Sequence, residues 1–405
     1  MDQTLDIAFV VLHTSPLDDP GTKDAGGMNV VVRAQAEELA RLGHRVQLIT
    51  RRSAPSQPDE LELAPGLTVF HLDAGEARLL AKGEHEALIE PFGEALAAHL
   101  ADHPSDVLHA EHWYSGLAAL SVAQDRGVPL VQSFHSIAAA ADTPLAEGER
   151  AEAPGRLEGE RKLAREAQLI VTVSEAEKAT VVQRLGGDAA RVRVVEPGVD
   201  TRLFRPCTGA ECADRAAWIE HGGRHEVLIA GRLDPLKGFD LAIAAIAAID
   251  AERRPALRIV GAPPPDGDDY ALSLHQAVAA AGMLGTTSFE GGLRRSVLAE
   301  HVRRASLVLI PSHSETYGLV ALEAAASGVP VVARAAGGLR EAVLDGETGV
   351  LLETDDPAVW ASIIERVIGD AELSERMGAA GRRFALQRSW LTSTRALLAA
   401  YRTVL

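Results

Sequence analysis

The sequence predicts an α/β protein with two domains, each built on an open parallel sheet. A length of 405 residues exceeds what one hydrophobic core usually serves. Short continuous apolar runs, as at 7–12, 227–230 and 307–310, are typical of strands buried on both faces of a parallel sheet. Between such runs lie stretches with the periodicity of amphipathic helices, closed by Gly or Pro. Strand and helix therefore alternate in both halves.

Composition excludes several classes of protein. The chain is 47% hydrophobic and 24% charged, as in a soluble globular enzyme, and its formal net charge of -17 argues against nucleic acid or anionic membrane as a partner. It has no apolar run of about eighteen residues, and its first residues are acidic where a signal peptide needs cations. We expect a cytoplasmic protein with small-molecule partners. The sequence leaves a homodimer open.

Two cysteines, Cys207 and Cys212, are too few for a disulfide framework. With His221 and His225 they form a Cys-x4-Cys, His-x3-His pattern. Eight residues separate the two pairs, where a zinc finger usually has about twelve. We expect no metal, and bound zinc is the less favoured alternative.

The first domain opens with a β-α-β unit. Strand 7–12 leads into a loop over 14–27 that ends in Gly26-Gly27. An amphipathic helix follows, closed by Gly43, and a second strand covers 45–50. Glycines between a strand and a helix serve a turn as often as they contact a phosphate.

Further strands are expected at 107–109, 129–133 and 169–173. His112 and His135 follow the first two of these, at the ends where open α/β sheets bind ligands. Taken alone, a histidine there is more often a structural hydrogen-bonding residue. Most charges of the segment 147–165 are expected to lie on a solvated helix face.

Residues 194–206 have the Pro and turn content of a crossing between domains, after which a second α/β series begins. Its strands are expected at 227–230, 257–260, 307–310 and 329–333. The acidic run 266–269 lies in a Pro/Gly-rich loop, and 336–341 is a further glycine turn entering a helix.

The turn after strand 307–310 predicts an anion site. Pro311 ends the strand, and Ser312 and Ser314 can cap the next helix. Gly318 lets the first helical turn approach a ligand, so that its backbone N–H groups can bind an anion. Glu315 and Glu323 lie eight residues apart, and we expect both to face one bound molecule from the same side and to accept hydrogen bonds from hydroxyls.

In two segments the residue identities point to one protein family more specifically than the spacing of the residues does. Glu-Thr-Tyr-Gly-Leu-Val-Ala-Leu-Glu-Ala, followed by Ala-Ser-Gly-Val-Pro-Val-Val-Ala, resembles the Glu-x7-Glu signature of family four of the retaining nucleotide-sugar glycosyltransferases. Gly-Arg-Leu-x-x-x-Lys-Gly over 231–238 matches the diphosphate-binding pair of that family. The resemblance implies the GT-B fold, in which two Rossmann-like domains face each other across a substrate cleft. By this resemblance, 1–203 and the crossover helix 386–405 form the acceptor-binding domain, and 204–385 form the nucleotide-sugar-binding domain.

The resemblance also implies a UDP-sugar donor and no tightly bound cofactor. Arg232 and Lys237 would stabilise the departing diphosphate, Glu323 would accept from ribose hydroxyls, and Glu315 from sugar hydroxyls. Together with His135, which would lie against the sugar near the reacting carbon, Arg232, Lys237 and Glu315 are the expected catalytic residues. The full expected donor set is Gly27, Arg232, Lys237, Glu315, Thr316, Tyr317, Gly318, Leu319 and Glu323.

The segment around Gly26-Gly27 resembles the branch of the family that transfers N-acetylglucosamine to inositol 3-phosphate and, less closely, the sucrose-phosphate branch. This implies an acceptor set of His13, Asn29, Lys82, His112, Ser136 and Arg156, in which Lys82, Ser136 and Arg156 hold the phosphate. His112 departs from the branch, which carries a tyrosine there. A hexose phosphate, an aminocyclitol or a natural-product aglycone is therefore an alternative acceptor. A non-catalytic nucleotide-sugar-binding protein is an alternative of another class.

Overall fold

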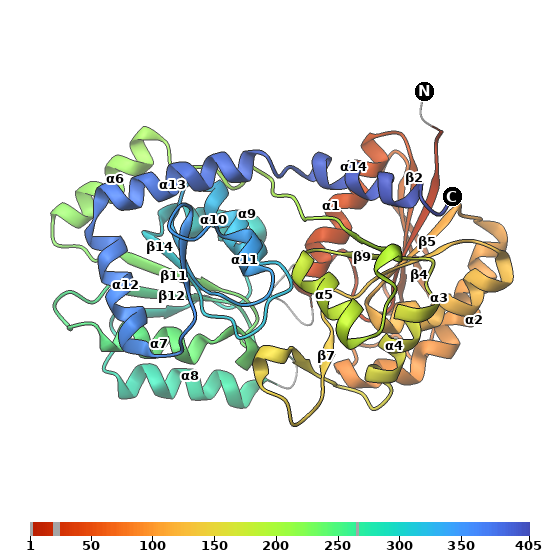
Figure 1. Ribbon diagram of the computed structural model, residues 1–405, viewed down its shortest axis with the longest axis horizontal. Helices are drawn as coiled ribbons and strands as arrows, with labels where there is room; N and C mark the ends of the chain where they lie inside the picture. Colours follow the sequence, from red (N-terminus) through yellow and green to blue (C-terminus); the bar gives the residue numbers. More distant parts are fainter. Residues whose placement is uncertain (1–2, 19–24, 265–266) are drawn as a thin grey trace. The chain divides into compact units, whose positions relative to one another are not determined.

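The protein is described by a computed structural model that covers residues 3–18, 25–264 and 267–405 (Figure 1). This part of the chain falls into two compact units. The first unit holds residues 3–18, 27–198 and 390–405, and the second holds 25–26 and 199–389. Chain segments far apart in sequence thus build the first unit, and its last helix comes from the carboxyl-terminal end of the chain.

The first unit is built on a sheet of order β10-β9-β6-β5-β1-β2-β4-β3. Its strands pair in parallel except β3, which is antiparallel to β4. Their bounds are β1 Asp6–Val11, β2 Arg45–Arg51, β3 Glu60–Ala64, β4 Leu67–Leu72, β5 Val107–Glu111, β6 Leu130–Ser133, β9 Leu169–Thr172 and β10 Val192–Val194. A separate short pair joins β7 Ala138–Ala139 and β8 Glu149–Arg150.

Helices cover both faces of this sheet, because β1 is apolar on both sides. Ala8 and Val10 point into a core shared with α2 and α3, whereas Phe9 and Val11 point into a core shared with α1 and α14. The helices are α1 Gly27–Arg41, α2 Ile89–Asp102, α3 His112–Arg126, α4 Arg156–Glu166, α5 Glu175–Arg184 and α14 Trp390–Tyr401, with 3-10 turns η1 Lys82–Leu88, η2 Leu145–Glu147 and η3 Ala189–Arg191. In Figure 1, α14 lies beside α1.

The second unit is built on a parallel sheet of order β13-β12-β11-β14-β15-β16. The strands are β11 Glu226–Ala230, β12 Ala256–Val260, β13 Thr287–Phe289, β14 Leu307–Ile310, β15 Val331–Arg334 and β16 Gly349–Leu352. The helices are α6 Gly209–Glu220, α7 Phe239–Ala248, α8 Asp268–Ala280, α9 Arg295–Arg304, α10 Leu319–Ala326, α11 Leu339–Ala342, α12 Pro357–Gly369 and α13 Ala371–Leu386, with a 3-10 turn η4 Pro235–Lys237. One core packs α7, α8 and α12 on the sheet, and α10 packs against α13.

Each sheet reverses its strand order at one point. In the first unit β1 lies between β5 and β2, and in the second β11 lies between β12 and β14. In open α/β sheets the carboxyl ends of the strands at such a reversal form a ligand-binding crevice. The loops after β1 and β5, and those after β11 and β14, are therefore where each unit offers a site.

The expected strands at 7–12, 45–50, 107–109, 129–133, 169–173, 227–230, 257–260, 307–310 and 329–333 are confirmed to within two residues. The β3-β4 hairpin and helix α2 were not anticipated. The expectation of a loop over 266–269 was wrong where it can be checked, because Asp268 and Asp269 form the first turn of α8; Asp266 lies outside the described residues.

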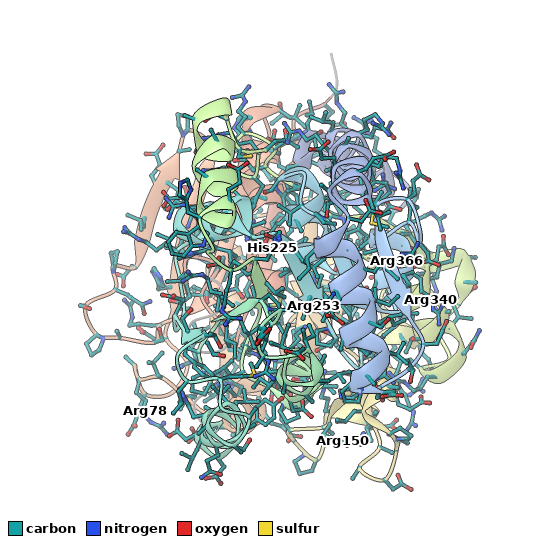
Figure 2. The ribbon with its side chains drawn as sticks, turned by 90° about the vertical axis from the view of Figure 1, so that its left-hand side faces the viewer. Arg78, Arg150, His225, Arg253, Arg340 and Arg366 are labelled. Atoms are coloured by element: carbon teal, nitrogen blue, oxygen red, sulfur yellow. The ribbon has the colours of Figure 1, made fainter. Side chains whose placement is uncertain are left out.

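Cys207, His221 and His225 of the cysteine and histidine pattern have partners other than a metal ion. Cys207 is disulfide-bonded. His221 Nδ1 lies 2.7 Å from Ala217 O, and His225 Nδ1 lies 3.0 Å from Ser306 Oγ, at the start of β11 (Figure 2). The side chain of Cys212 lies outside the described residues. Within the described part of the chain, no three His, Cys, Asp or Glu side chains gather as metal ligands.

Arginines on the surface pair with nearby carboxylates. The labelled Arg78, Arg253 and Arg340 in Figure 2 contact Glu84, Glu365 and Glu353, respectively. Such exposed pairs contribute little to stability. Over residues 3–18, 25–264 and 267–405, no helix combines the length and the apolar character needed to cross a bilayer.

Candidate active site

In the second unit, the loops after β11 and β14 bring Lys237 and Glu315 together. Lys237 Nζ donates to Glu315 Oε2 at 2.7 Å. A backbone bond from His313 N to Leu236 O, 2.8 Å long, holds the two loops side by side. The Lys237 and Glu315 side chains remain 28% and 17% exposed, so a ligand can reach both. A cation and a carboxylate, both expected to contact the donor, therefore meet at the point where the strand order reverses.

A close backbone contact explains the glycine after Lys237. Gly238 has φ +66°, and a Cβ added there would lie 2.3 Å from Pro311 O. The glycine turn expected near the donor packs on the same loop: a Cβ on Gly337 would lie 2.2 Å from Glu315 O, and Gly338 N donates to Glu315 O at 2.9 Å. Glycines on two neighbouring loops thus hold the segment that carries Glu315.

Helix α10 begins later than the sequence suggested. Gly318, with φ +110°, is its N-cap residue, and no side chain caps the helix. The expectation that Ser312 or Ser314 caps it was wrong, because the N-cap residue is the left-handed Gly318. Glu315 therefore lies in the loop before the helix, and that it faces the same bound molecule as Glu323 stays a prediction. The uncapped first turn leaves backbone N–H groups to bind an anion next to Glu315.

Glu323 is the carboxylate that α10 itself carries. It is 2% exposed and accepts from Arg295 Nη2 at 2.6 Å. Arg295 is the first residue of α9, and its guanidinium lies 5.1 Å from the centre of the Phe204 ring. No motif marked Arg295 in the sequence; its role depends on α9 packing beside α10.

The other expected donor residues of the second unit, Arg232, Thr316, Tyr317 and Leu319, lie in the same loops or at the start of α10. Arg232 precedes η4, and its Nη2 lies 3.8 Å from Asp234 Oδ2. Thr316 and Leu319 are half-buried, and Tyr317 is buried. Gly27, the first residue of α1, belongs to the first unit.

In the first unit, aromatic side chains gather after β1 and β5. The rings of His13 and His112 are 4.3 Å apart between centroids, and Tyr114 lies 5.1 Å from His112 and 5.8 Å from His13. His112 opens α3 with φ +70°, in the left-handed region. Asn29 Nδ2 donates to Ser15 O at 2.7 Å and so holds the loop that follows His13. Three expected acceptor residues therefore meet where the strand order of this sheet reverses.

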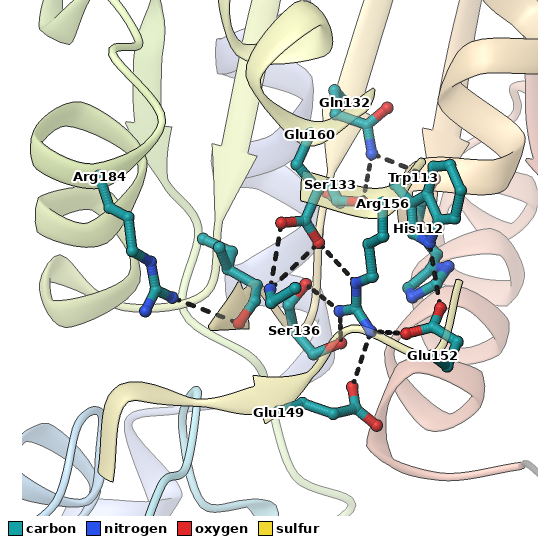
Figure 3. Close-up of polar contacts among 12 residues, drawn as sticks. His112, Trp113, Gln132, Ser133, Ser136, Glu149, Glu152, Arg156, Glu160 and Arg184 are labelled. Carbon is teal, nitrogen blue, oxygen red and sulfur yellow. Dashed lines mark hydrogen bonds and ion pairs between the residues drawn. The ribbon is translucent and has the colours of Figure 1, made fainter. Parts of the chain in front are cut away.

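Arg156 is enclosed by carboxylates (Figure 3). Its Nε donates to Glu160 at 2.8 Å, and Nη1 donates to Glu149 at 3.2 Å and to Glu152. Nη2 donates to Ser136 O at 3.2 Å and to Ser136 Oγ at 2.9 Å. The guanidinium is 0% exposed.

Glu158, Arg161, Lys162 and Arg165 are exposed, in line with the solvated helix face expected for most charges of 147–165, but Glu160 is buried together with Arg156. Burial opposes the charge of Arg156, but Glu149, Glu160 and Glu152 outweigh burial and raise the pKa of Arg156. A phosphate could reach this guanidinium only by displacing carboxylates. Lys82, the third expected phosphate residue, opens η1, but its side chain lies outside the described residues.

His135 belongs to a buried network that sequence reasoning missed. Its Nε2 pairs with Glu111 Oε2, and Glu111 lies 1% exposed at the end of β5. His109 Nε2 lies 3.5 Å from Glu111 Oε1, and His109 Nδ1 lies 2.7 Å from Tyr401 OH. Only the spacing of His109 and Glu111 on one strand hinted at this, because residues two apart face the same side of a sheet.

Two family models match the chain in succession. One, described as a glycosyl transferase 4-like domain, matches residues 26–198, and the other, described as glycosyl transferases group 1, matches residues 213–384.

Curated relatives match almost the whole chain. A D-inositol 3-phosphate glycosyltransferase from Thermobifida fusca is 38% identical, over 98% of this chain and 93% of the relative. One of the same name from Geodermatophilus obscurus is 40% identical, over 98% of this chain and 88% of the relative.

Solved structures agree in fold. Sucrose-phosphate synthase from Thermosynechococcus elongatus has a TM-score of 0.88 at 28% identity, covering 98% of each chain. Anabaena HepE in complex with UDP-glucose has a TM-score of 0.76 at 20% identity, covering 99% of this chain and 100% of that one. With its two matched domains and its full-length relatives, the chain belongs to family four of the glycosyltransferases, enzymes of the GT-B fold.

Proposed function

We propose that the enzyme transfers a hexosyl group, N-acetylglucosamine or glucose, from a UDP-sugar to a hydroxyl group of a small soluble acceptor. The observation that carries this proposal is the contact between Lys237 and Glu315 beside the uncapped start of α10. A cation and free helical N–H groups suit a diphosphate, and a carboxylate suits a sugar hydroxyl. The UDP-glucose complex of Anabaena HepE supports the choice of nucleotide.

The residues of the second unit act on the leaving group. Arg232, Lys237 and the first N–H groups of α10 stabilise the negative charge that grows on the diphosphate as the bond to the sugar breaks. Because this stabilisation is stronger in the transition state, losing one such group typically lowers kcat by roughly 10² to 10³. Glu323 binds the ribose and Glu315 binds the sugar. A diphosphate oxygen takes the proton of the acceptor hydroxyl, on the same face of the sugar, so the anomeric configuration is retained.

The first acceptor we propose is 1D-myo-inositol 3-phosphate, because the curated relatives bear the name D-inositol 3-phosphate glycosyltransferase. His13, Asn29 and His112 then bind the hydroxyl-bearing ring, and Lys82, Ser136 and Arg156 bind the phosphate.

A second candidate is the same transfer to an acceptor without a phosphate at this position. It is favoured by Arg156, which already donates hydrogen bonds to Glu149, Glu152, Glu160 and Ser136. In this structure the guanidinium is not open to an anion. An aminocyclitol or a natural-product aglycone meets that condition.

An acceptor panel separates the two candidates. UDP-GlcNAc and UDP-glucose are each offered with inositol 3-phosphate, myo-inositol, glucose 6-phosphate and an aminocyclitol, and released UDP and the product mass are measured. Product with inositol 3-phosphate alone supports the first candidate, and product with unphosphorylated acceptors alone supports the second. No acceptor-dependent release of UDP from either donor would refute the proposed function.

Two variants check that turnover comes from the described site. Lys237→Met removes the cation beside Glu315 and should abolish most of the UDP release. Arg253→Met breaks an exposed ion pair with Glu365 and should leave the rate unchanged. The anomeric configuration of the product, read from its proton NMR couplings, tests retention.

A further inference from the structure

We propose that Glu111 is a positioning residue that keeps His135 protonated, so that the second ring nitrogen of His135 is a permanent hydrogen-bond donor to an oxygen of a substrate bound at the carboxyl ends of β5 and β6. This inference rests on the proposed function for its ligand. The pairing of Glu111 with His135 stands on the geometry of the first unit alone.

The sheet brings the two residues together. Strands β5 and β6 are parallel neighbours, with Glu111 opposite Ser133, so the ends of both strands lie side by side. The chain then turns at His135, which has φ +58°, a left-handed conformation that is unfavourable for a non-glycine residue and is kept where the surroundings fix it. This turn directs the ring back onto Glu111, and Nε2 pairs with Glu111 Oε2.

Among the residues that the structure describes, the other neighbours of Glu111 carry no positive charge, so the negative charge of Glu111 is available to pair with His135. Ser133 Oγ donates its one proton to Val171 O at 3.2 Å, so it accepts from His109 Nε2 at 2.8 Å. His109 therefore carries its proton on Nε2, and its Nδ1 accepts from Tyr401 OH at 2.7 Å. Burial lowers the pKa of His109, which keeps that ring neutral.

The other groups that face His135 also favour its charged form. Burial alone would lower the pKa of His135, but the Glu111 carboxylate outweighs burial and raises it, with a further contribution from Glu177 on α5. In the same way, burial would raise the pKa of Glu111, whereas the charge and the hydrogen bond of His135 lower it. The pair is thus an imidazolium and a carboxylate.

The consequence is a defined role for the ring. Glu111 occupies Nε2, and the His135 side chain keeps 10% exposure, so Nδ1 is the nitrogen that a ligand can reach. In an imidazolium both nitrogens carry protons, and Nδ1 can only donate. His135 therefore binds a hydroxyl or phosphate oxygen of a substrate at the ends of these strands and does not serve as a general base.

The test is a titration of His135 by NMR on the isotope-labelled full chain without substrate, with its signal assigned from the spectrum of His135→Gln. We expect His135 in the unaltered protein to titrate above the ordinary value of about 6.5. Glu111→Gln keeps the shape and an acceptor oxygen but removes the charge. We expect the titration in that variant to move to lower pH by about one to three pH units, as when an opposite charge within about 4–6 Å is lost.

Turnover gives a second readout. Because the pKa of His135 is raised, the protonated form is present at low pH and is lost as the pH rises through that pKa, so kcat/KM should fall on the alkaline side. In Glu111→Gln this fall should move to lower pH. Tyr401→Phe is the matched control, since it disturbs the same buried network but leaves the charge of Glu111. It should lower the melting temperature without moving either curve.

Two results would overturn the proposal. One is a His135 that titrates at or below about 6.5 in the unaltered protein, which needs no variant to fold. The other is an unchanged His135 titration in Glu111→Gln. Failure of the proposed function is distinguishable, because a protein that turns over no UDP-sugar would still show whether Glu111 governs the titration of His135.

Discussion

Replacing Lys237 by Met should be the most damaging single change in the second unit. Removing one charged group that faces a developing anion typically lowers kcat by roughly 10² to 10³, or about 2.7–4 kcal/mol of transition-state stabilisation. Lys237 Nζ also lies 2.7 Å from Glu315 Oε2, so its removal leaves a carboxylate facing the diphosphate. Two like charges about 4 Å apart repel by about 4 kcal/mol at an effective dielectric constant of about 20. The loss should therefore fall at the upper end of that range.

The same contact predicts how a second change behaves. In a chain that already carries Lys237→Met, Glu315→Gln removes the repulsion and should restore part of kcat, although Glu315→Gln alone lowers it. For residues in direct contact, such a coupling energy is about 0.5–3 kcal/mol.

The assay is steady-state UDP release at saturating donor and acceptor for the unaltered chain, both single variants and the double variant. Melting temperatures of all four chains show that they fold. A Lys237→Met chain that keeps the kcat of the unaltered protein would refute the assignment of Lys237 to the leaving group. Strictly additive losses would refute the coupling between Lys237 and Glu315.

Three further outcomes are expected. Gly238→Ala should lower the free energy of unfolding by about 1–3 kcal/mol and weaken UDP binding. Its matched control is Gly282→Ala, because Gly282 has a φ of +67° against +66° for Gly238 but no atom within 4 Å of the added Cβ, so this variant should lose less stability and no affinity for UDP. Denaturant melts measure the stability of each variant, and calorimetry measures its affinity for UDP. Arg295→Gln leaves the 2% exposed Glu323 without its cation, and should weaken UDP binding roughly tenfold, or about 1.4 kcal/mol, by calorimetry; unchanged affinity would contradict a role for this pair in the nucleotide site. Burial lowers the pKa of His99 to about 4, so the unfolded chain binds its proton first and stability should fall as the pH drops from about 6.5 to 4; His99→Gln should flatten that part of the melting-temperature profile, and an equally steep profile would contradict it.

Much of the fold could be predicted because a strand buried on both faces of a parallel sheet consists of a continuous run of apolar residues. The run 307–310 coincides with β14, and the turn after it carries Glu315 as expected. The start of α10 could not be predicted, because the serines before it resemble caps, and only the left-handed φ of Gly318 shows where the helix begins.

The parts of the site that were missed depend on contacts between distant residues. Glu111 looks like an ordinary charged residue until the β5-β6 register brings it to His135. The burial of Glu160 with Arg156 was not anticipated in a segment of mostly solvated charges, because a sequence does not show that three carboxylates fold onto one guanidinium. In both cases local composition indicates exposure, and the tertiary fold reverses it.

Helix α14 bears on the order in which the chain can fold as it leaves the ribosome. Residues 199–389 of the second unit are synthesised in one stretch, so that unit can become compact while translation continues. The first unit lacks Leu397 and Tyr401 from its interior until residues 390–401 have been synthesised. The first unit therefore begins to emerge before the second but is completed after it. A nascent chain stalled before residue 390 would hold an incomplete first unit and a complete second unit.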